Sequence, residues 1–279
     1  LQALIANPHA VIWVLNTDRE KTLGTDYCVR AAVWGTLLAR QIGMSKDDLD
    51  TVFRGTLLAD IGMQMLPERL VNKTGHFRKK EYLAYRKHIQ FGLQIIAEIP
   101  NLDERIASIV RNHHERHDGL GFPRGLRGEQ IPVLARITCL AYCFERLINS
   151  NNPARRVSPA RAMSRIYKQR LLKFPEQLVG EFSAAMGMYP VGTLVTLNSK
   201  EVALVLEQSD KGKMSPKIAV LSDPRGNKLE QPQIVDLANK DSAERVRSIT
   251  GPTDMRNTAV DPRDYTFAFA GKRILGFRL

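Results

Sequence analysis

Residues 113–128 read HHERHDGLGFPRGLRG, and this stretch indicates both the fold and the chemistry of the chain. Two adjacent histidines stand where a predicted helix ends, and a loop with glycines at 119, 121 and 125 follows them. A single histidine on an apolar helix face is most often a buried residue that hydrogen-bonds within the core. A histidine pair at a helix end is harder to explain in that way, so it indicates a site to which other helices also contribute.

Asp60 and His88 are the residues that other helices are expected to contribute. His88 and His113 each share an inward face with apolar residues at helical spacing. Burying several ionisable groups is costly unless they are paired, and a divalent cation pairs with them efficiently. Three imidazoles and one carboxylate suit iron, manganese, zinc or nickel. The pattern predicts one divalent transition metal at Asp60, His88, His113 and His114; the alternative is an empty site whose members hydrogen-bond to one another.

Hydrophobic periodicity divides the chain into a helical part and a β-prone part. From about residue 25 to 187 the apolar residues recur with helical spacing, and helix start signals stand at Pro132, Ser158-Pro159 and Pro175. Beyond that region the sequence changes to short β-prone runs separated by turn formers. We therefore expect a mainly α fold, a helical bundle with a small C-terminal β subdomain.

The change from helical periodicity to β-prone runs also predicts domain boundaries. The expected parts are an N-terminal flank at 1–24, a helical domain at 25–187, a β subdomain at 188–240 and a C-terminal tail or extra strand at 241–279. The extra strand would be formed by Tyr265-Thr266-Phe267-Ala268-Phe269. Within the helical domain, Phe53, Leu57 and Ile61 are expected to face inward on a helix that ends at Gly62. Because the first residue is not methionine, we expect the chain to be a fragment.

The net charge of the 279 residues is +12, which favours an anionic partner such as a nucleotide, a nucleic acid or an acidic protein surface. Basic residues are concentrated at 78–87 and 155–173, although a solvated helix face is the better explanation for any one of them taken singly. Nucleic-acid binding calls for aromatic side chains between the basic ones, and residues 154–173 hold only Tyr167 of that kind. Nucleic acid therefore ranks last among these partners.

No run of apolar residues approaches the roughly 18 to 20 that a membrane helix requires. The first residues lack the basic flank and the small-residue cleavage site of a signal peptide. The three cysteines include no Cys-x-x-Cys pair, as is usual in a reducing compartment. We therefore expect no membrane span and a cytoplasmic location.

Three blocks resemble the bacterial HD-GYP family in order and spacing. They are LLADIGMQMLPERLVNKTGHFRKKEYLAYRKHIQFGLQII at 57–96, HHERHDGLGFPRGLRGEQIP at 113–132 and LARITCLAYCFERLINS at 134–150. The GYP element stands here as Gly121-Phe122-Pro123. The resemblance implies the helical bundle of the HD superfamily and the chemistry of cyclic di-GMP signalling. Members of the family hydrolyse cyclic di-GMP to pGpG or GMP, using two or three metal ions that hold a bridging hydroxide.

The chain departs from the family pattern at four positions. They are Tyr27 for a histidine, Ala59 for the histidine of the His-Asp pair, Met63 for a lysine and Tyr142 for an aspartate. The resemblance implies that one metal is surrounded by the first-helix histidine, the His-Asp pair and the late aspartate, so three of these losses fall on that one metal. The second metal's set survives as Asp60, His88, His113 and His114. Tyr142 is then expected to occupy space where the first ion would lie.

The losses predict a degenerate, catalytically impaired HD-GYP protein that binds cyclic di-GMP, a related nucleotide or a protein partner. The resemblance suggests diguanylate cyclase (GGDEF) domain proteins as such partners. The alternative is an active cyclic di-GMP phosphodiesterase that uses one metal. The glycine-rich loop is expected to bind the ligand through phosphate-facing amides and bidentate arginines, although turn formation and surface charge explain its composition equally well. The ligand-binding candidates are Arg116, Asp118, Gly119, Gly121, Phe122, Pro123, Arg124 and Arg127.

Overall fold

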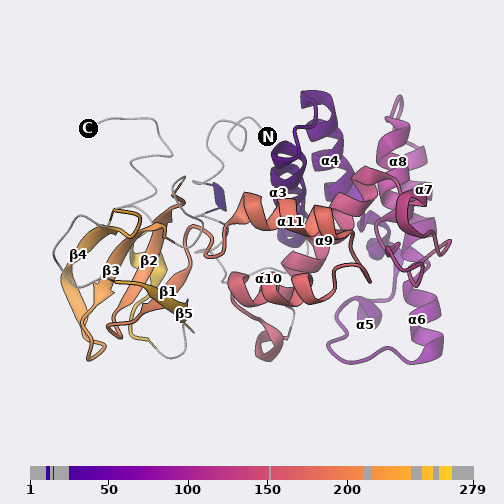
Figure 1. The fold of residues 1–279 in the computed structure, drawn as a ribbon. Coiled ribbons are helices and arrows are strands. Elements are labelled where there is room, and N and C mark those ends of the chain that lie inside the picture. The colour runs from indigo at the N-terminus through magenta and orange to yellow at the C-terminus, as the bar shows by residue number, and fades with distance from the viewer. Residues whose placement is uncertain are drawn as a thin grey trace. The chain divides into compact units, whose positions relative to one another are not determined.

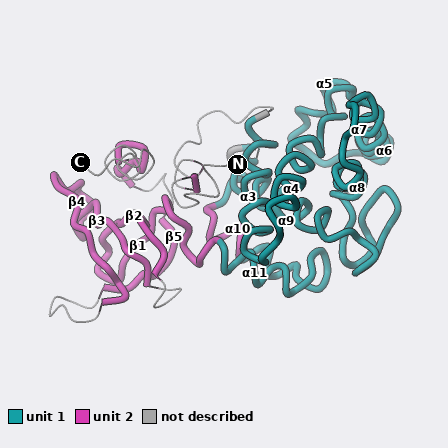
Figure 2. Tube along the Cα trace, turned by 90° about the horizontal axis from the view of Figure 1, so that it is seen from above, with its two compact units in different colours: residues 1, 21–157, 164–185 teal, residues 2–20, 158–163, 186–279 magenta. Residues whose placement is uncertain are grey.

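The structure is a computed structural model that describes residues 11–12, 15, 25–150, 152–209, 215–239, 247–253 and 258–265. The chain forms two compact units, which Figure 2 shows in different colours. Apart from Leu1, the first unit holds residues 21–157 and 164–185. The second unit holds residues 2–20, 158–163 and 186–279. Among the described residues no helix is long and apolar enough to cross a membrane.

The first unit is helical (Figure 1). Its α-helices and 3-10 helices (η) are α3 Thr25–Gln41, α4 Lys46–Leu58, η1 Ile61–Met65, α5 Glu68–Val71, α6 Lys79–Tyr85, α7 His88–Ala97, α8 Glu104–Asn112, η2 Gly128–Gln130, α9 Val133–Ile148, η3 Pro153–Arg155 and α11 Glu176–Met186. One further helix, α10 Pro159–Lys168, begins in the second unit and ends in the first. Helix α3 packs against α4 and α9, α4 packs against α8, and α7 packs against η1.

Large buried side chains hold these helices together. Trp34 of α3 and Phe144 of α9 are fully buried, with their ring centroids 5.4 Å apart in an edge-to-face arrangement. The Trp34 indole donates a hydrogen bond to a carboxylate oxygen of Glu145 at 2.8 Å, so this polar pair is satisfied inside the core. Edge-to-face aromatic pairs add stability beyond the area they bury.

Two glycines set how closely the elements around Asp60 approach each other. A side chain at Gly62 of η1 would clash with the backbone of His88 at the start of α7. A side chain at Gly55 of α4 would clash with Ile109 of α8. Residues without a Cβ therefore let η1 and α8 lie against their neighbours. This packing brings the end of α4 close to the start of α7.

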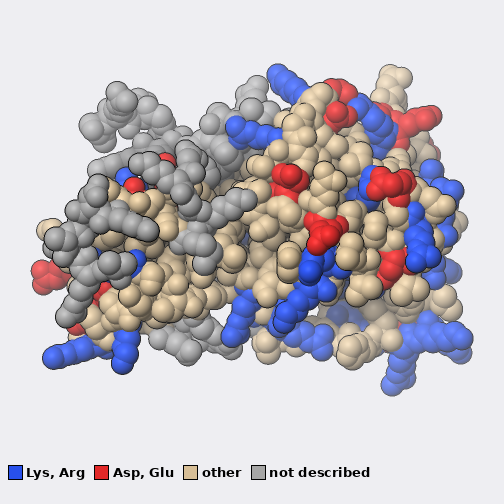
Figure 3. Space-filling model, viewed as in Figure 1, with Lys and Arg blue, Asp and Glu red and all other residues tan. Residues whose placement is uncertain are grey.

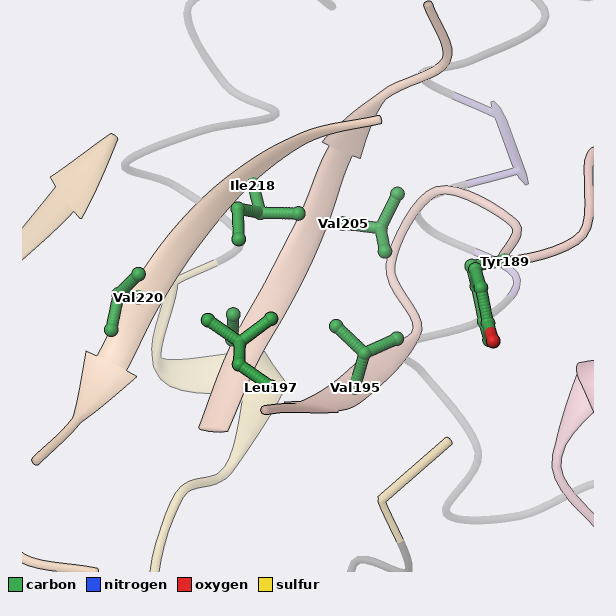
Figure 4. Packing of buried hydrophobic residues seen from close by; sticks show 7 residues of the cluster. Tyr189, Val195, Leu197, Val205, Ile218 and Val220 are labelled. Carbon is green, nitrogen blue, oxygen red and sulfur yellow. The ribbon is translucent and has the colours of Figure 1, made fainter. Parts of the chain in front are cut away.

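The second unit contains a five-stranded antiparallel sheet in the order β4-β3-β2-β1-β5. Its strands are β1 Leu194–Leu197, β2 Val202–Glu207, β3 Lys217–Ser222, β4 Lys228–Asp236 and β5 Ile249–Pro252. One face carries a cluster of buried side chains, drawn in Figure 4: Tyr189, Val195, Leu197, Ala203, Val205, Ile218 and Val220. The β-branched residues that predicted strands here therefore form the core of the sheet.

The predicted fold class is confirmed, since the chain is mainly helical with a small β sheet toward its C-terminus. The predicted helix starts are confirmed too: Pro132 is the N-cap of α9, α10 begins at Pro159, and α11 begins directly after Pro175. Strand β5 was not anticipated. In the segment expected to form a further strand, Tyr265 lies in a 3-10 helix, Pro262–Tyr265, and residues 266–269 lie outside the described part. The domain boundaries stay a prediction; residues 158–163 group with the second unit.

The inward face and the end of α4 differ from the expectation. The helix ends at Leu58 instead of Gly62, and Phe53 and Leu57 are only half-buried. The residues of α4 that are buried are Leu49, Thr51, Val52, Gly55 and Thr56. Thr56 contributes to the core because its hydroxyl is 2.9 Å from that of Thr138 in α9, which satisfies both. Small and internally bonded residues thus permit close packing that a search for large apolar residues misses.

Candidate metal centre

The structure brings together the four side chains that the sequence nominated as metal ligands. Asp60 lies between α4 and η1, His88 opens α7, and His113 and His114 directly follow α8. One candidate ligand atom from each lies within 4.8 Å of all the others. The Nε2 atoms of the three histidines are 3.4, 3.3 and 4.0 Å from Asp60 Oδ1, in the order of their numbers. Asp60 is therefore the centre of the cluster.

Two of the imidazoles are oriented by the backbone. His88 Nδ1 lies 2.6 Å from the carbonyl oxygen of Tyr85, and His113 Nδ1 lies 2.9 Å from that of Val110. Because a carbonyl oxygen only accepts hydrogen bonds, each Nδ1 must carry the proton. Each Nε2 then presents a lone pair toward Asp60. A metal-ligating histidine typically has its second nitrogen fixed in this way.

The atoms at the centre of the cluster fit a cation. Asp60 Oδ1, His88 Nε2 and His113 Nε2 are buried and have no hydrogen-bond partner among the described residues. Leaving such atoms unmatched costs about 1–3 kcal/mol each. Two ligand atoms that are each about 2.1 Å from one ion are at most about 4.2 Å apart. The candidate ligand atoms here lie within 4.8 Å of one another, which is close to that limit. The donor set, three imidazoles and a carboxylate, therefore suits a divalent transition metal.

His114 is held by the loop that follows it. Its ring stacks on Phe122, with the centroids 4.5 Å apart and an interplanar angle of 22°. Its Nε2 lies 3.5 Å from the hydroxyl of Tyr85. Gly121 makes the stacking possible, because a side chain there would clash with the backbone of residues 114–116. The Gly-Phe-Pro element thus positions one of the candidate ligands.

The charge states in the cluster also suit a metal. Burial lowers the pKa of His88, and burial together with the neighbouring imidazoles lowers the pKa of His114 well below its usual value. Burial acts to raise the pKa of Asp60, but its interactions with His113 and His88 outweigh that effect and lower it. These shifts favour neutral imidazoles at His88 and His114 and an ionised carboxylate at Asp60, and these are the protonation states that bind metals.

The other side of Asp60 carries aromatic and small side chains, and we call Tyr27, Ala31, Ala59 and Tyr142 the aromatic half of the pocket. Ala31, Ala59 and Tyr142 form one buried cluster against which Tyr27 packs. The rings of Tyr27 and Tyr142 lie edge to face with their centroids 5.2 Å apart. Tyr142 also faces His113 across a centroid distance of 5.7 Å. The two halves of the pocket are therefore in direct contact.

The hydroxyls of the aromatic half are already bonded. Tyr142 donates to the carbonyl oxygen of Thr56 at 3.0 Å, and Tyr27 donates to the carbonyl oxygen of Tyr142 at 3.4 Å. Burial raises the pKa of both phenols well above the usual value, so both stay neutral. A neutral phenol that donates elsewhere is a poor metal ligand. Met63, which stands where the HD-GYP pattern has a lysine, is half-buried in η1.

The glycine-rich loop has the predicted shape but uses several of its amides internally. The amides of Arg124 and Leu126 donate to the two carboxylate oxygens of buried Glu115 at 2.7 and 3.0 Å. The amide of Leu120 donates to Asp118, and that of Phe122 donates to the carbonyl oxygen of His114. These four amides are therefore engaged inside the loop, and the expectation that amides of the loop face a phosphate stays a prediction.

The arginines of the loop differ in whether they form an ion pair with another described residue. Arg116 forms a bidentate pair with Asp118, with nitrogen-to-oxygen distances of 3.1 and 2.6 Å. Arg124 and Arg127 are exposed, and neither forms an ion pair with another described residue. Gly119 and Gly125 have φ of 77° and 68°, a conformation that favours glycine. Pro123 is exposed. The ligand-binding role of these residues remains a prediction.

Two residues that shape the site were not nominated from the sequence. Glu115 anchors the loop, and Tyr85 orients His88 through its carbonyl oxygen and contacts His114 through its hydroxyl. Glu115 stands inside the motif that drew attention to the site, but its alternation with histidines gave no sign that it would be buried. Tyr85 stands three residues before His88, the spacing at which a backbone carbonyl reaches an imidazole.

Comparisons with known proteins place both parts of the chain. An HD domain family model matches residues 15–178, and a model for a KOW domain associated with HD domains matches residues 194–255. A cyclic di-GMP phosphodiesterase of Pseudomonas aeruginosa is 29% identical over 246 residues, which is 88% of this chain and 59% of the relative. A cyclic di-GMP phosphodiesterase response regulator of Xanthomonas campestris is 28% identical over 164 residues, which is 53% of this chain and 43% of the relative.

A solved structure supports the fold. A protein of Bdellovibrio bacteriovorus, described as an HDG"Y"P protein, superimposes with a TM-score of 0.56 at 22% identity, over 66% of this chain and 58% of that one. At 22% sequence identity, this similarity supports the fold and nothing beyond it. This chain thus spans well under two thirds of the length of the two relatives and of this solved structure.

Proposed function

The chain belongs to the HD domain family, and on that premise we propose that it is a degenerate HD-GYP protein of cyclic di-GMP signalling. In this proposal it holds one divalent metal and lacks the second, and it acts by binding cyclic di-GMP or a protein partner more than by hydrolysis. The relatives named as cyclic di-GMP phosphodiesterases support the choice of ligand. A GGDEF domain protein is the partner that family resemblance suggests.

The metal would be held by Asp60, His88, His113 and His114. Their buried and unmatched ligand atoms support this assignment. A bound cation would act as a Lewis acid toward a phosphoryl oxygen. His88 and His113 would keep their orientation through their bonds to backbone carbonyls, and Phe122 would keep His114 in place. Exposed Arg124 and Arg127 would attract the phosphates of a dinucleotide at the same loop.

The observation that carries the proposal is the aromatic half of the pocket. Two-metal phosphodiesterases divide the charge of the attacking and leaving oxygens between two cations. Here the space beside Asp60 is filled by Tyr142, whose hydroxyl is committed to a backbone carbonyl, and by buried Ala59. The four residues of the aromatic half themselves offer a second cation no carboxylate or imidazole. We therefore expect hydrolysis to be feeble or absent.

A one-metal phosphodiesterase is the second candidate. The intact histidine cluster and the ordered Gly-Phe-Pro loop favour it, because together they place a cation site beside exposed arginines. In that case the remaining metal would polarise the scissile phosphate without a partner ion. The charge near the loop attracts a dinucleotide under both candidates, so binding alone does not distinguish them.

Turnover distinguishes the two candidates. The protein is incubated with cyclic di-GMP and either manganese or ferrous iron, and pGpG is measured by chromatography. We expect no turnover above that of the His113→Ala variant. Turnover that His113→Ala abolishes would overturn the regulatory proposal in favour of the one-metal enzyme. Where turnover is absent, calorimetry with cyclic di-GMP should still show binding, and a lack of heat would leave only the protein partner.

Rebuilding the lost ligands tests the assignment of the two halves. Ala59→His alone should restore neither a second metal equivalent nor hydrolysis, because Tyr27 and Tyr142 still occupy the other ligand positions. Combining it with Tyr27→His and Tyr142→Asp supplies all the missing groups and should add a second equivalent by elemental analysis. Full activity from Ala59→His alone would show that the ligand sets have been assigned wrongly.

A further inference from the structure

A groove of about 390 Å³ lies on the first unit, outside the histidine cluster. We call it the α6–α7 groove; its lining residues are Leu83, Arg86, Lys87, Ile89, Gln90, Leu93, Arg111 and Pro123. Helices α6, α7 and α8 and the Gly-Phe-Pro loop each contribute to it. Its volume is at the lower end of the range for binding pockets in proteins, about 300 to 1,000 Å³.

Three of the lining residues are cations that have no carboxylate partner in the described part of the chain. Among the described residues, no acidic oxygen lies within 4.0 Å of the charged groups of Arg86, Lys87 or Arg111. Arg105, on the same helix as Arg111, shows the contrast: Asp47, Asp48 and Asp103 all pair with it. Uncompensated cations around one groove repel each other, and an acidic ligand would relieve that repulsion.

The wall between the cations is aliphatic. Leu83 is 52% exposed although it lies in the middle of α6, and Leu93 and Pro123 add further apolar surface. None of the lining residues is aromatic, which favours an aliphatic side chain over a stacked nucleic-acid base as the apolar part of a ligand. Figure 3 shows many Lys and Arg side chains, with Asp and Glu side chains among them, on the side of the first unit that carries α6 and α7. An apolar strip bordered by cations fits an acidic, amphipathic protein segment.

The groove is connected to the histidine cluster through one ring. The Arg86 guanidinium lies 5.0 Å from the centroid of Phe122 and donates a hydrogen bond to the carbonyl oxygen of Pro123 at 3.4 Å. The opposite neighbour of Phe122 is His114, on which it stacks. An occupant of the groove would therefore contact the same loop that positions a candidate metal ligand.

We propose that the α6–α7 groove is the docking site for an acidic amphipathic segment of a partner protein, with carboxylates on Lys87 and Arg111 and apolar side chains on Leu83. The inference rests on the proposed function, since it gives a location to the protein partner named there. It does not depend on a bound metal or on cyclic di-GMP. The complementary charge and the unpaired state of the groove's cations carry it.

The test uses a fluorescein-labelled peptide roughly 14 residues long, built from Leu and Glu at helical spacing, and a matched peptide in which every Glu is Gln. Fluorescence anisotropy with the full chain should show binding of the Glu peptide. The Gln peptide should bind at least about tenfold more weakly, and Lys87→Glu combined with Arg111→Glu should weaken the Glu peptide by a similar factor. Leu83→Gln should weaken both peptides.

The matched control is Lys46→Glu combined with Arg225→Glu, two exposed cations far from the groove in sequence that carry the same change of net charge. It should bind the Glu peptide as the unchanged protein does. Equal weakening in the control, equal binding of both peptides, or no measurable binding would each overturn the docking site. Direct binding of a labelled single-stranded oligonucleotide that the groove variants abolish and the control pair leaves unchanged would also overturn it. Metal content and cyclic di-GMP binding, measured on the same variants, should not change, so failure here is separable from failure of the proposed function.

Discussion

The histidine half and the aromatic half of the pocket meet at Asp60 but differ in how their polar atoms are satisfied. The histidine half consists of His88, His113 and His114. In the histidine half, His88 Nε2 and His113 Nε2 are buried, point at Asp60 and have no hydrogen-bond partner among the described residues. In the aromatic half, the hydroxyls of Tyr27 and Tyr142 bond to backbone carbonyls. The first half therefore keeps buried polar atoms that a cation would match, whereas the phenol hydroxyls of the second are already matched by the protein.

Under the proposed function, this difference teaches that losing a metal site involves more than losing its ligands. A pocket from which ligands are simply removed would be left as a cavity, and cavities destabilise a core. Here the replacing side chains form packed, hydrogen-bonded structure, with Ala59 giving room for the ring of Tyr142. We infer that the aromatic half contributes to stability, whereas the histidine half is retained at a cost to stability that a ligand would offset.

The largest expected effect breaks the aromatic half. Tyr142→Ala should lower the free energy of unfolding by about 3–5 kcal/mol, because it opens a cavity between Tyr27 and Ala59 and removes a buried hydrogen bond. Tyr142→Phe keeps the ring and should cost only about 1 kcal/mol. Urea unfolding of the two variants measures both values. A loss below about 1 kcal/mol in Tyr142→Ala would show that the ring is not part of a packed core.

The next effect concerns the histidine half. His113→Ala removes a central ligand and should weaken binding of manganese or zinc by at least about 100-fold, or about 2.7 kcal/mol, as measured by titration calorimetry. His117→Ala is the matched control, since His117 lies in the same motif but outside the cluster. The unchanged protein should bind one equivalent. Two equivalents, or equal losses in both variants, would remove the distinction between the halves.

The sequence predicted the histidine half well, for a physical reason. His88 and His113 lie on apolar helical faces, so the periodicity that builds the core also brings them inward. His114 followed from its place beside His113. The convergence of four residues from three segments could then be expected from the cost of burying each of them alone. Their geometry, within 4.8 Å of one another, required the structure.

The aromatic half and the loop were harder to predict. Tyr27, Ala59 and Tyr142 look like ordinary core residues, and only resemblance to the HD-GYP family marked them as departures. The use of loop amides by Glu115 depends on a fold in which residues 115, 124 and 126 meet, which no periodicity indicates. The early end of α4 likewise depends on the approach of η1 to α7 at Gly62, a tertiary contact.

The smallest expected effect sharpens the comparison through pH. In the unfolded chain a tyrosine ionises near pH 10, whereas burial raises the pKa of Tyr27 and Tyr142 in the folded protein. The folded state therefore keeps protons that the unfolded state releases. The stability from these groups is fully present below about pH 10 and is lost as the pH rises from there toward their folded pKa.

Tyr142→Phe removes one of these ionisations. Above about pH 10 its free energy of unfolding should fall less steeply than that of the unchanged protein, by at most about 1.4 kcal/mol per pH unit. Urea unfolding at a series of pH values on either side of pH 10 gives the two slopes, and Tyr167→Phe is the control because that side chain is 52% exposed. Parallel slopes for Tyr142→Phe and the unchanged protein would mean that Tyr142 ionises equally well in both states. The aromatic half would then be open to water, and its phenol would be available to a second ion after all.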